Sequence, residues 1–380
     1  MKSIFLIASL LLAFTINSQS NIDKTMMSGG ISRSYKLYIP AMYNGTSSVA
    51  LVLNLHGLGS NSQQQMFYGD FRTIADTANF IIVHPQGTYE SSLAANYWNA
   101  YFGRAVNDID FLAEMIDTIS AHYNIDINRV HSTGMSNGGY MSLALAAGLN
   151  DKIASVASVT GSMTHIFPSS TVNTKPISVM QIHGTADSTV KYGGDGNSKS
   201  IQNVLNYWIS HNNTNSTPVI DSIPNTSITD NSKAIRYIYG SGTDNTEVIH
   251  YKIIGGEHTW PNSAFTSGVT NKDFDASKVI WAFFNKHQKV NTVGLKEIET
   301  LNLVSFVNDI DNNRLILKTV LPNSKLKYVI YSMAGKRIGG NQLVNEMNEV
   351  ETQSLNSGIY VIRVMEVNSL RFNSFKFVVR

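Results

Sequence analysis

Residues 130–140, VHSTGMSNGGY, decide how the rest of the chain is interpreted. Within them, residues 134–138 (GMSNG) match the pattern G-x-S-x-G, in which a sharp turn between a strand and a helix presents a serine hydroxyl. A pattern this short arises by chance in about one chain in five of this length. Whether Ser136 is a nucleophile therefore depends on the residues that surround it in the fold.

Around this stretch, from about residue 30 to residue 287, short apolar runs alternate with longer segments of helical periodicity. Such alternation is typical of βαβ units and predicts an α/β fold with a mostly parallel central sheet. Several runs are continuously apolar, as expected for strands covered on both faces. The expected strands span residues 35–39, 50–55, 80–83, 130–133, 153–159, 177–182 and 248–253. The expected helices span 110–123, with Asn107 or Asp108 as the N-cap, 138–147, 200–211 and 276–286.

The start of the chain has a pattern of its own. Residues 1–20 combine Lys2, a following apolar run and small polar residues, which predicts a secretory signal peptide cleaved near residues 18–20. Residues 21–290 then form the α/β catalytic domain, and residues 291–302 form a linker. The working compartment is expected to lie outside the cytoplasm.

Residues 303–380 contain short segments in which apolar and polar residues alternate, and this period predicts a small β-sandwich. Its role stays open between an export signal and a polysaccharide-binding module, although all four tryptophans of the chain precede it. Deletion of residues 295–380 separates the two, because a sorting tail leaves activity and binding to solid substrate intact. The expected strands are 315–320, 326–331, 358–364 and 375–379, with turns at 322–323, 339–340 and 356–358.

The composition excludes several kinds of site. The chain has no cysteine, which rules out disulfides, thiolate nucleophiles and metal sites with cysteine ligands. No histidines or acidic residues have the spacing of a known metal motif, so we expect neither metal nor cofactor. A formal net charge of +2 without a basic run argues against nucleic acid as a partner, and no later segment is apolar for long enough to span a bilayer.

A nucleophilic serine needs a base and an acid that orients the base. Asp187 follows the apolar run 177–182, and His258 follows the run 248–253 on a glycine-rich loop, so both are expected at the carboxyl ends of strands, where open α/β sheets build their sites. Taken singly, Asp187 could cap its own loop and His258 could be a surface histidine. Their order after Ser136 favours a catalytic set instead.

A fourth element lies upstream, where residues 53–59 (LNLHGLG) end a strand in an H-G-x-G loop. Beside a nucleophile elbow, this loop supplies one backbone N–H to the oxyanion and the residue after the nucleophile supplies another. The predicted donors are the backbone amides of Leu58 and Asn137, each worth about 3 to 4 kcal/mol in the transition state. His56 is expected to be a structural part of its turn.

The segments HGLGS, GMSNGGYM, HGTADSTVKYGG and GGEHTWP, in this order, resemble a family of secreted α/β-hydrolase esterases. That family holds feruloyl esterases, acetylxylan esterases and polyhydroxybutyrate depolymerase-like enzymes. The resemblance covers about residues 25–290 and implies that Ser136 is the nucleophile, Asp187 the acid and His258 the base.

The end of the chain has a second resemblance. The segments YVIYSMAGKRI, LNSGIYVIRV and FKFVVR look like the C-terminal sorting domain of the type IX secretion system of Bacteroidota. The resemblance implies the secretion machinery as a partner and a route through the periplasm to the outside of the cell. Some bacteroidotal esterases with such a tail hydrolyse poly(ethylene terephthalate), and this chain is similar to them in layout.

Trp98 and Trp260 are the candidate substrate-binding residues. Trp98 lies in a loop after the third core strand, and Trp260 lies two residues after His258, so each could form an aromatic wall of the cleft. Core packing is the alternative for both. Related enzymes often have cysteines near the oxyanion loop and the loop at 96–99, and since this chain has none, its cleft loops are expected to be less tied down.

The leading hypothesis is a secreted, monomeric serine carboxylic ester hydrolase that forms an acyl-enzyme with aromatic or short-chain acyl esters and polyesters, poly(ethylene terephthalate) included. An acetylxylan esterase, a serine peptidase on the same fold and an inactive binding protein are the alternatives. The sequence leaves the natural ester open.

Overall fold

The computed structural model divides into two compact units, Met1–Asn291 and Thr292–Arg380. The predicted linker and residues 1–18 of the predicted signal peptide lie outside the described residues. The structure describes residues 19–168, 175–265, 267–289, 304–310, 312–319, 325–333, 336–343, 345–367 and 372–379.

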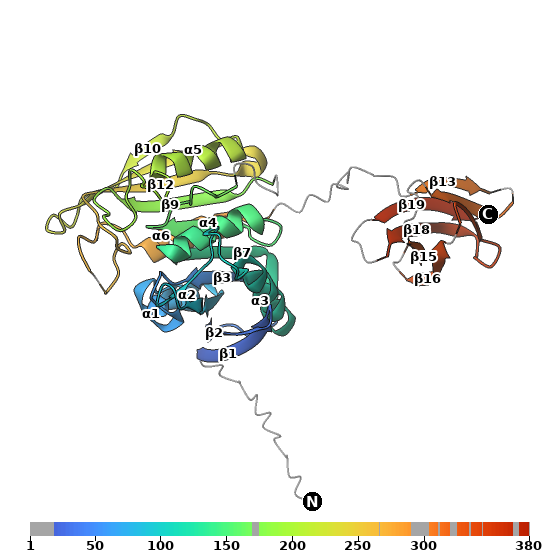
Figure 1. Cartoon of the computed structure of the whole chain (residues 1–380), viewed down its shortest axis with the longest axis horizontal. Coiled ribbons are helices and arrows are strands. Elements are labelled where there is room, and N and C mark those ends of the chain that lie inside the picture. The colour runs from blue at the N-terminus through green and yellow to red at the C-terminus, as the bar shows by residue number, and fades with distance from the viewer. Residues whose placement is uncertain are drawn as a thin grey trace, which may run out of the picture. The chain divides into compact units, whose positions relative to one another are not determined.

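The first unit is built on one ten-stranded sheet in the order β1-β2-β4-β3-β7-β8-β9-β12-β11-β10 (Figure 1). Its six central strands are parallel, and each edge carries two antiparallel strands. The strands are β1 (Ser20–Ser28), β2 (Ile31–Ile39), β3 (Val49–Leu55), β4 (Ile81–Pro85), β7 (Ile125–Met135), β8 (Ser155–Val159), β9 (Ser178–Gly184), β10 (Val219–Ser222), β11 (Lys233–Tyr239) and β12 (Val248–Ile254). A separate two-stranded sheet pairs β5 (Thr88–Glu90) with β6 (Ala95–Tyr97).

The central strands form where the sequence is mostly apolar. Every residue of β3, β4, β8 and β9 is buried. Because a parallel strand is covered on both faces, such runs pack into a sheet between two layers of helices. The α/β fold with a mostly parallel sheet is confirmed.

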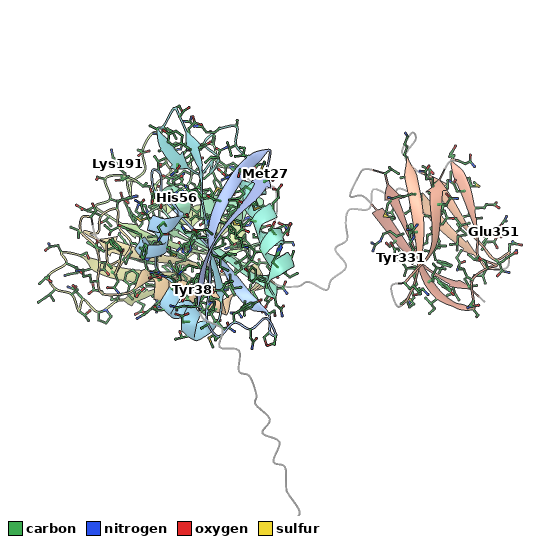
Figure 2. All side chains as sticks on the ribbon, turned by 90° about the horizontal axis from the view of Figure 1, so that it is seen from below. Met27, Tyr38, His56, Lys191, Tyr331 and Glu351 are labelled. Atoms are coloured by element: carbon green, nitrogen blue, oxygen red, sulfur yellow. The ribbon has the colours of Figure 1, made fainter. Side chains whose placement is uncertain are left out.

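Helices cover both faces of this sheet, and each face has its own apolar cluster. One cluster includes side chains of α3, α4 and α5, and the other includes side chains of α2 and α6; packed side chains fill the unit (Figure 2). Asn107 caps α3, since its side chain accepts a hydrogen bond from the Asp110 amide. The helices are α1 (Ser62–Tyr68), α2 (Arg72–Ala78), α3 (Asp108–His122), α4 (Asn137–Gly148), α5 (Ile201–Asn212) and α6 (Ala276–Lys286). Among the described residues, none of these helices is long and apolar enough to cross a membrane.

The second unit consists of two antiparallel sheets that share one apolar cluster, so it is a small β-sandwich. One sheet has the order β13-β14-β17 and the other β16-β15-β18-β19. The strands are β13 (Val304–Asp309), β14 (Arg314–Thr319), β15 (Leu326–Ser332), β16 (Arg337–Leu343), β17 (Met347–Glu351), β18 (Gly358–Glu366) and β19 (Phe372–Val379).

One turn expected in the second unit is wrong. Gly339 and Gly340 lie inside β16, which pairs with β15. A Cβ at Gly340 would lie 2.4 Å from the backbone oxygen of Tyr328, so the glycine permits a close approach of two strands and does not mark a reversal of the chain. The turn expected at 322–323 lies outside the described residues.

Candidate active site

Ser136 lies at the sharp turn between β7 and α4. Its backbone has φ 54° and ψ −120°, a strained conformation for a residue with a side chain, which costs about 1–3 kcal/mol. The surrounding packing enforces it, because the Ser136 amide donates to the Val159 carbonyl at 2.8 Å. Glycine is required at Gly138, the second residue of α4, because a Cβ there would lie 2.1 Å from the Leu55 backbone oxygen. The hydroxyl is therefore fixed at the carboxyl end of a central strand.

Asp187 and His258 are brought together by neighbouring parallel strands, β9 and β12. The loops after these strands are joined by a hydrogen bond from the Ala186 amide to the Gly256 carbonyl at 2.9 Å. Gly184 lets them approach, since a Cβ there would lie 2.1 Å from the Gly256 oxygen. As a result, Nδ1 of His258 lies 2.8 Å from Oδ2 of Asp187.

The Asp187 carboxyl is held in its ionised form. Burial raises its pKa, but hydrogen bonds from His183 and His258 outweigh the burial and hold the pKa well below its ordinary range. Its other oxygen, Oδ1, accepts from the amides of Thr189 and Val190 at 2.9 and 2.8 Å. A carboxylate with these partners keeps the Nδ1 proton on His258 and leaves Nε2 to act as a base.

His183 is a partner of Asp187 that the sequence motifs did not indicate. Its Nε2 lies 3.3 Å from Oδ2 of Asp187 and 2.7 Å from the Val190 carbonyl, so this nitrogen carries the proton. Its Nδ1 lies 3.1 Å from Nε2 of Gln181, which donates to it. The signal was present in HGTAD at 183–187, where the histidine and the aspartate are four residues apart across a tight loop.

Two pockets of about 570 Å³ each meet at Ser136 and Leu58. The first, here the histidine pocket, is lined by His258 together with Gln64, Phe67 and others. The second, here the tyrosine pocket, has aromatic walls and also contains Asn137; its rings are those of Tyr97, Tyr101, Phe102 and Tyr140. A molecule bound across Ser136 would place one part in each pocket.

The predicted oxyanion donors lie beside the serine. Asn137 is the first residue of α4, and the first N–H groups of a helix have no partner within it. Leu58 lines both pockets, and its side chain is 54% exposed. Leu58 and Asn137 line the tyrosine pocket together with Ser136, which is where the predicted amide donors would meet a bound carbonyl oxygen.

The loop that carries Leu58 is tied to the segment 86–99 by hydrogen bonds. The Gly59 amide donates to the Asn96 carbonyl at 2.9 Å, and Nδ2 of Asn96 donates to the Ser60 carbonyl at 3.0 Å. The Gly87 amide donates to Nε2 of His56 at 2.9 Å. In the absence of cysteines, these hydrogen bonds connect the oxyanion loop to the loop at 96–99.

His56 is a structural residue, as predicted. Burial lowers its pKa to about 4, so the ring is neutral at physiological pH. Because Nε2 accepts from the Gly87 amide, the proton is on Nδ1, which donates to the Gly57 carbonyl at 2.8 Å. Both nitrogens are thus used to shape the loop.

Trp98 forms no wall of the cleft, which corrects the expectation for this residue. Its side chain is fully buried, and its indole N–H donates to the His56 carbonyl at 2.9 Å. Its backbone is bound on both sides by the Asn137 side chain: the Trp98 amide donates to Oδ1 at 2.6 Å, and Nδ2 donates to the Trp98 carbonyl at 3.0 Å. Trp98 is therefore hydrogen-bonded to both segments that carry the predicted oxyanion donors, through the His56 carbonyl and the Asn137 side chain.

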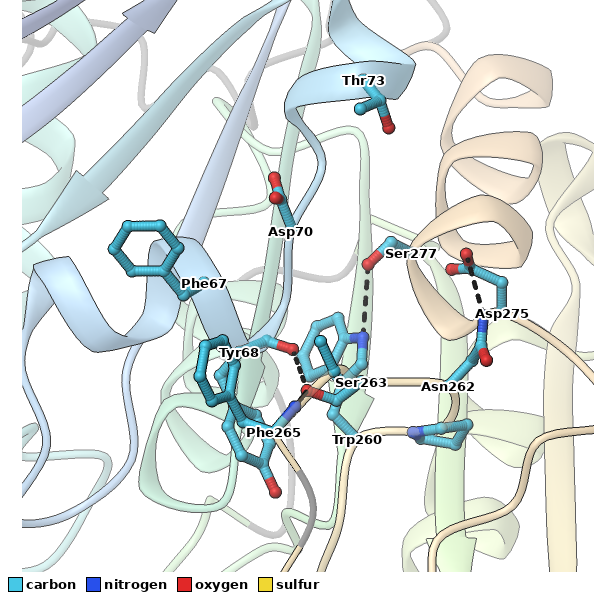
Figure 3. A pocket seen from close by; sticks show the side chains of 12 residues that line it. Phe67, Tyr68, Asp70, Thr73, Trp260, Asn262, Ser263, Phe265, Asp275 and Ser277 are labelled. Atoms are coloured by element: carbon cyan, nitrogen blue, oxygen red, sulfur yellow. Dashed lines mark hydrogen bonds between the residues drawn. The ribbon is translucent and has the colours of Figure 1, made fainter.

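Trp260 borders a third pocket of about 320 Å³, here the distal pocket (Figure 3). The ring is 1% exposed, and its N–H donates to Ser277 at 3.2 Å, so packing dominates its role. The distal pocket shares Phe67, Tyr68 and Phe265 with the histidine pocket, so the two are neighbours. No group of three or more potential metal ligands occurs in the described part of the chain.

Comparison with known proteins gives two family matches. Residues 43–239 match the model of the phospholipase/carboxylesterase family. Residues 311–380 match the model of a secretion system C-terminal sorting domain.

Individual relatives are all distant. The chain is 26% identical to a bifunctional acetylxylan esterase/xylanase of Neocallimastix patriciarum (62% of this chain, 32% of that one) and 29% identical to feruloyl esterase D of Neurospora crassa (42% and 55%). It is 24% identical to poly(3-hydroxyalkanoate) depolymerase C of Paucimonas lemoignei (42% and 39%). The matches thus span between 32% and 55% of these relatives. Among solved structures, an acetyl xylan esterase from Aspergillus awamori matches with a TM-score of 0.48 at 16% identity, over 63% of this chain and 94% of that one.

Proposed function

The chain belongs to the phospholipase/carboxylesterase family, and from this premise we propose that it is an exported serine ester hydrolase. The observation that carries the proposal is the pocket that Ser136, on its strained turn, shares with His258, whose Nδ1 is hydrogen-bonded to Asp187. Ser136 and His258 line the same pocket, so a bound ester can reach both. No cofactor enters the proposed reaction.

In the first step, Oγ of Ser136 attacks the ester carbonyl while Nε2 of His258 takes the hydroxyl proton. The new O–C bond forms as the carbonyl π electrons move to oxygen, which the amides of Leu58 and Asn137 stabilise. The tetrahedral intermediate then breaks its bond to the alcohol oxygen, and this oxygen receives the proton from His258. The alcohol leaves, and the acyl group stays on Ser136.

In the second step, water attacks the acyl-enzyme, and His258 accepts one of its protons. The bond between Oγ and the acyl carbon breaks, and the proton returns to Oγ. The carboxylic acid is released, and Asp187 remains ionised throughout because it only stabilises the imidazolium.

For substrates, we propose aromatic or short-chain acyl esters and polyesters, with poly(ethylene terephthalate) in the range. The support is the aromatic lining of the tyrosine pocket, together with relatives named as feruloyl esterase and polyhydroxyalkanoate depolymerase. An acetylxylan esterase is the second candidate, favoured by the relative with that activity in its name.

Replacement of the nucleophile tests the reaction. Ser136→Ala should reduce kcat for a chromogenic short-chain ester by about 10⁵ to 10⁶-fold, as expected when a nucleophilic serine is removed. The matched control is Ser216→Ala, at an exposed position between α5 and β10, which should hydrolyse the ester at the wild-type rate. Full activity in Ser136→Ala would refute the mechanism.

For export, we propose that the second unit is the tail read by the type IX secretion machinery, after passage through the periplasm, and that the enzyme is a monomer. The match of residues 311–380 to a secretion sorting domain supports the role of the tail. Deletion of residues 295–380 should block appearance of the enzyme outside the cell and leave its activity in lysates unchanged. Lost activity on solid substrate alone would instead indicate a binding module.

A further inference from the structure

We infer that an ester binds across Ser136 in one orientation, with its acyl group in the tyrosine pocket and its alcohol group in the histidine pocket. A long alcohol group extends further, into the distal pocket. We further infer that the distal pocket binds an uncharged chain that bears hydroxyl or ether oxygens. The inference rests on the proposed function and adds to it the orientation and the chemistry of the alcohol side.

The direction follows from where the proton must go. The alcohol oxygen leaves only if it is protonated, and the proton is on Nε2 of His258 at that moment. The leaving oxygen must therefore lie against His258. Of the two pockets that meet at Ser136, the histidine pocket is the one that His258 lines, so the alcohol occupies it.

The tyrosine pocket is suited to the acyl group. It contains Asn137, so it begins where the carbonyl oxygen is expected to bind. Tyr140 is held in place by a hydrogen bond with Ser198, and burial raises its pKa to about 12, so it remains a neutral phenol. Together with Phe102, which is 38% exposed, it forms part of an apolar wall for a flat acyl ring.

On the alcohol side, two exposed rings mark the passage from one pocket to the next. Phe67 and Phe265 are 41% and 57% exposed, and their ring centroids lie 6.4 Å apart, edge to face. Both rings, with Tyr68, belong to the histidine pocket and to the distal pocket. A chain that leaves the histidine pocket along these rings enters the distal pocket.

The distal pocket is polar and acidic beyond the rings (Figure 3). Its wall includes the carboxylates of Asp70 and Asp275, besides Thr73, Asn262 and Ser263. Asp70 is paired with Arg72 at 2.7 Å, and Asp275 caps α6, so both are fixed in position. Carboxylate, amide and hydroxyl groups bind hydroxyl-bearing chains, and no cationic side chain is among the described residues that line the pocket to bind an anionic one.

The test fills the distal pocket and compares two series of esters. In one series, benzoate is fixed and the alcohol grows from methanol to tetraethylene glycol; in the other, methanol is fixed and the acyl chain grows. Thr73→Trp places a large ring in the pocket from an exposed position of α2. Its matched control is Thr77→Trp, one turn later on the same helix and also exposed, but outside the three pockets.

Thr73→Trp should lower kcat/KM for the tetraethylene glycol ester tenfold or more and leave methyl benzoate unchanged, while Thr77→Trp should change neither. In the wild type, a glycol chain ending in a carboxylate should react several-fold more slowly than the hydroxyl-ended chain, because its charge would lose water without gaining a cationic partner in the pocket. Phe102→Ala should lower kcat/KM for methyl benzoate more than for methyl acetate.

Three results would overturn the inference. Slower reaction of the long acyl chains in Thr73→Trp, with the glycol esters spared, would reverse the direction. Equal rates for all esters in Thr73→Trp and the wild type would show that the distal pocket takes no part. A wild-type enzyme that hydrolyses none of these esters would refute the proposed function itself, and the inference with it.

Discussion

The two sides of Ser136 are built in different ways. On one side, Asp187 and His258 meet through a charged hydrogen bond between side chains, with His183 as a second partner. On the other side, neutral hydrogen bonds hold the segments that carry the predicted oxyanion donors, the amides of Leu58 and Asn137. Catalysis on the acid–base side therefore depends on the chemical identity of the side chains, whereas on the amide side it depends on the position of the loop that carries Leu58.

The largest effect on activity is expected from a variant that disrupts the acid–base side. Asp187→Asn removes the charge that fixes the tautomer of His258, and kcat should fall by about 10⁴-fold. The matched control is Asp221→Asn on β10, whose carboxylate forms a partly exposed ion pair with Arg236 of β11; this variant should keep its activity. Steady-state kinetics on a short-chain ester measures both. A loss below tenfold in Asp187→Asn would mean that the carboxylate is not the orienting group.

A smaller effect is expected on the amide side. Asn137→Ala removes both hydrogen bonds to the Trp98 backbone and keeps the Asn137 amide itself. A displaced donor should cost less than a deleted one, so we expect kcat to fall by about 10 to 100-fold with KM nearly constant.

Trp98→Phe sharpens this result, because it retains most of the packing and loses only the hydrogen bond to the His56 carbonyl. It should lower kcat in the same way by about tenfold. If both variants lower the melting temperature but keep the kcat of the wild type, the Asn137–Trp98 contact stabilises the fold without positioning the amides.

The pH dependence of the free energy of unfolding should also distinguish the acid–base side from the amide side. The pKa of Asp187 is lowered in the folded protein, so its ionised form stabilises the fold fully above the ordinary value of about 3.9, and the stabilisation is lost as pH falls through the folded value. Urea unfolding should show wild type more stable than Asp187→Asn by about 2 kcal/mol at pH 6, with the difference shrinking below pH 4. The Asn137→Ala difference should not change over this range, since no titrating group is removed.

The centre of the sheet could be predicted from the sequence, and its edges could not. The expected strands at 50–55 and 177–182 overlap β3 and β9, because strands buried on both faces are mostly apolar, even where Asn54 and Gln181 interrupt them. The edge strands β1 and β10 are largely exposed and carry no such pattern. Helices α1 and α2 have seven residues each, too few to show a helical period.

The same distinction holds in the site. Asp187 and His258 could be located because each follows a mostly apolar strand and their order after the serine is that of the α/β-hydrolase fold. The loop position of Trp98 suggests exposure, but its ring packs in the apolar core and its backbone is bound by the side chain of Asn137, 39 residues away in the sequence. The hydrogen bonds that hold the Leu58 loop involve backbone atoms, which no residue type reveals.

The edge strand β1 has a consequence for the chain during export. It begins at Ser20, next to the predicted cleavage site, and pairs along its length with β2. Asp23 and Lys24 are exposed on it, and charged residues on an edge discourage two copies from joining strand to strand. Cleavage several residues later than predicted would shorten this strand and leave part of β2 without its partner, and an unpaired strand edge favours pairing between copies.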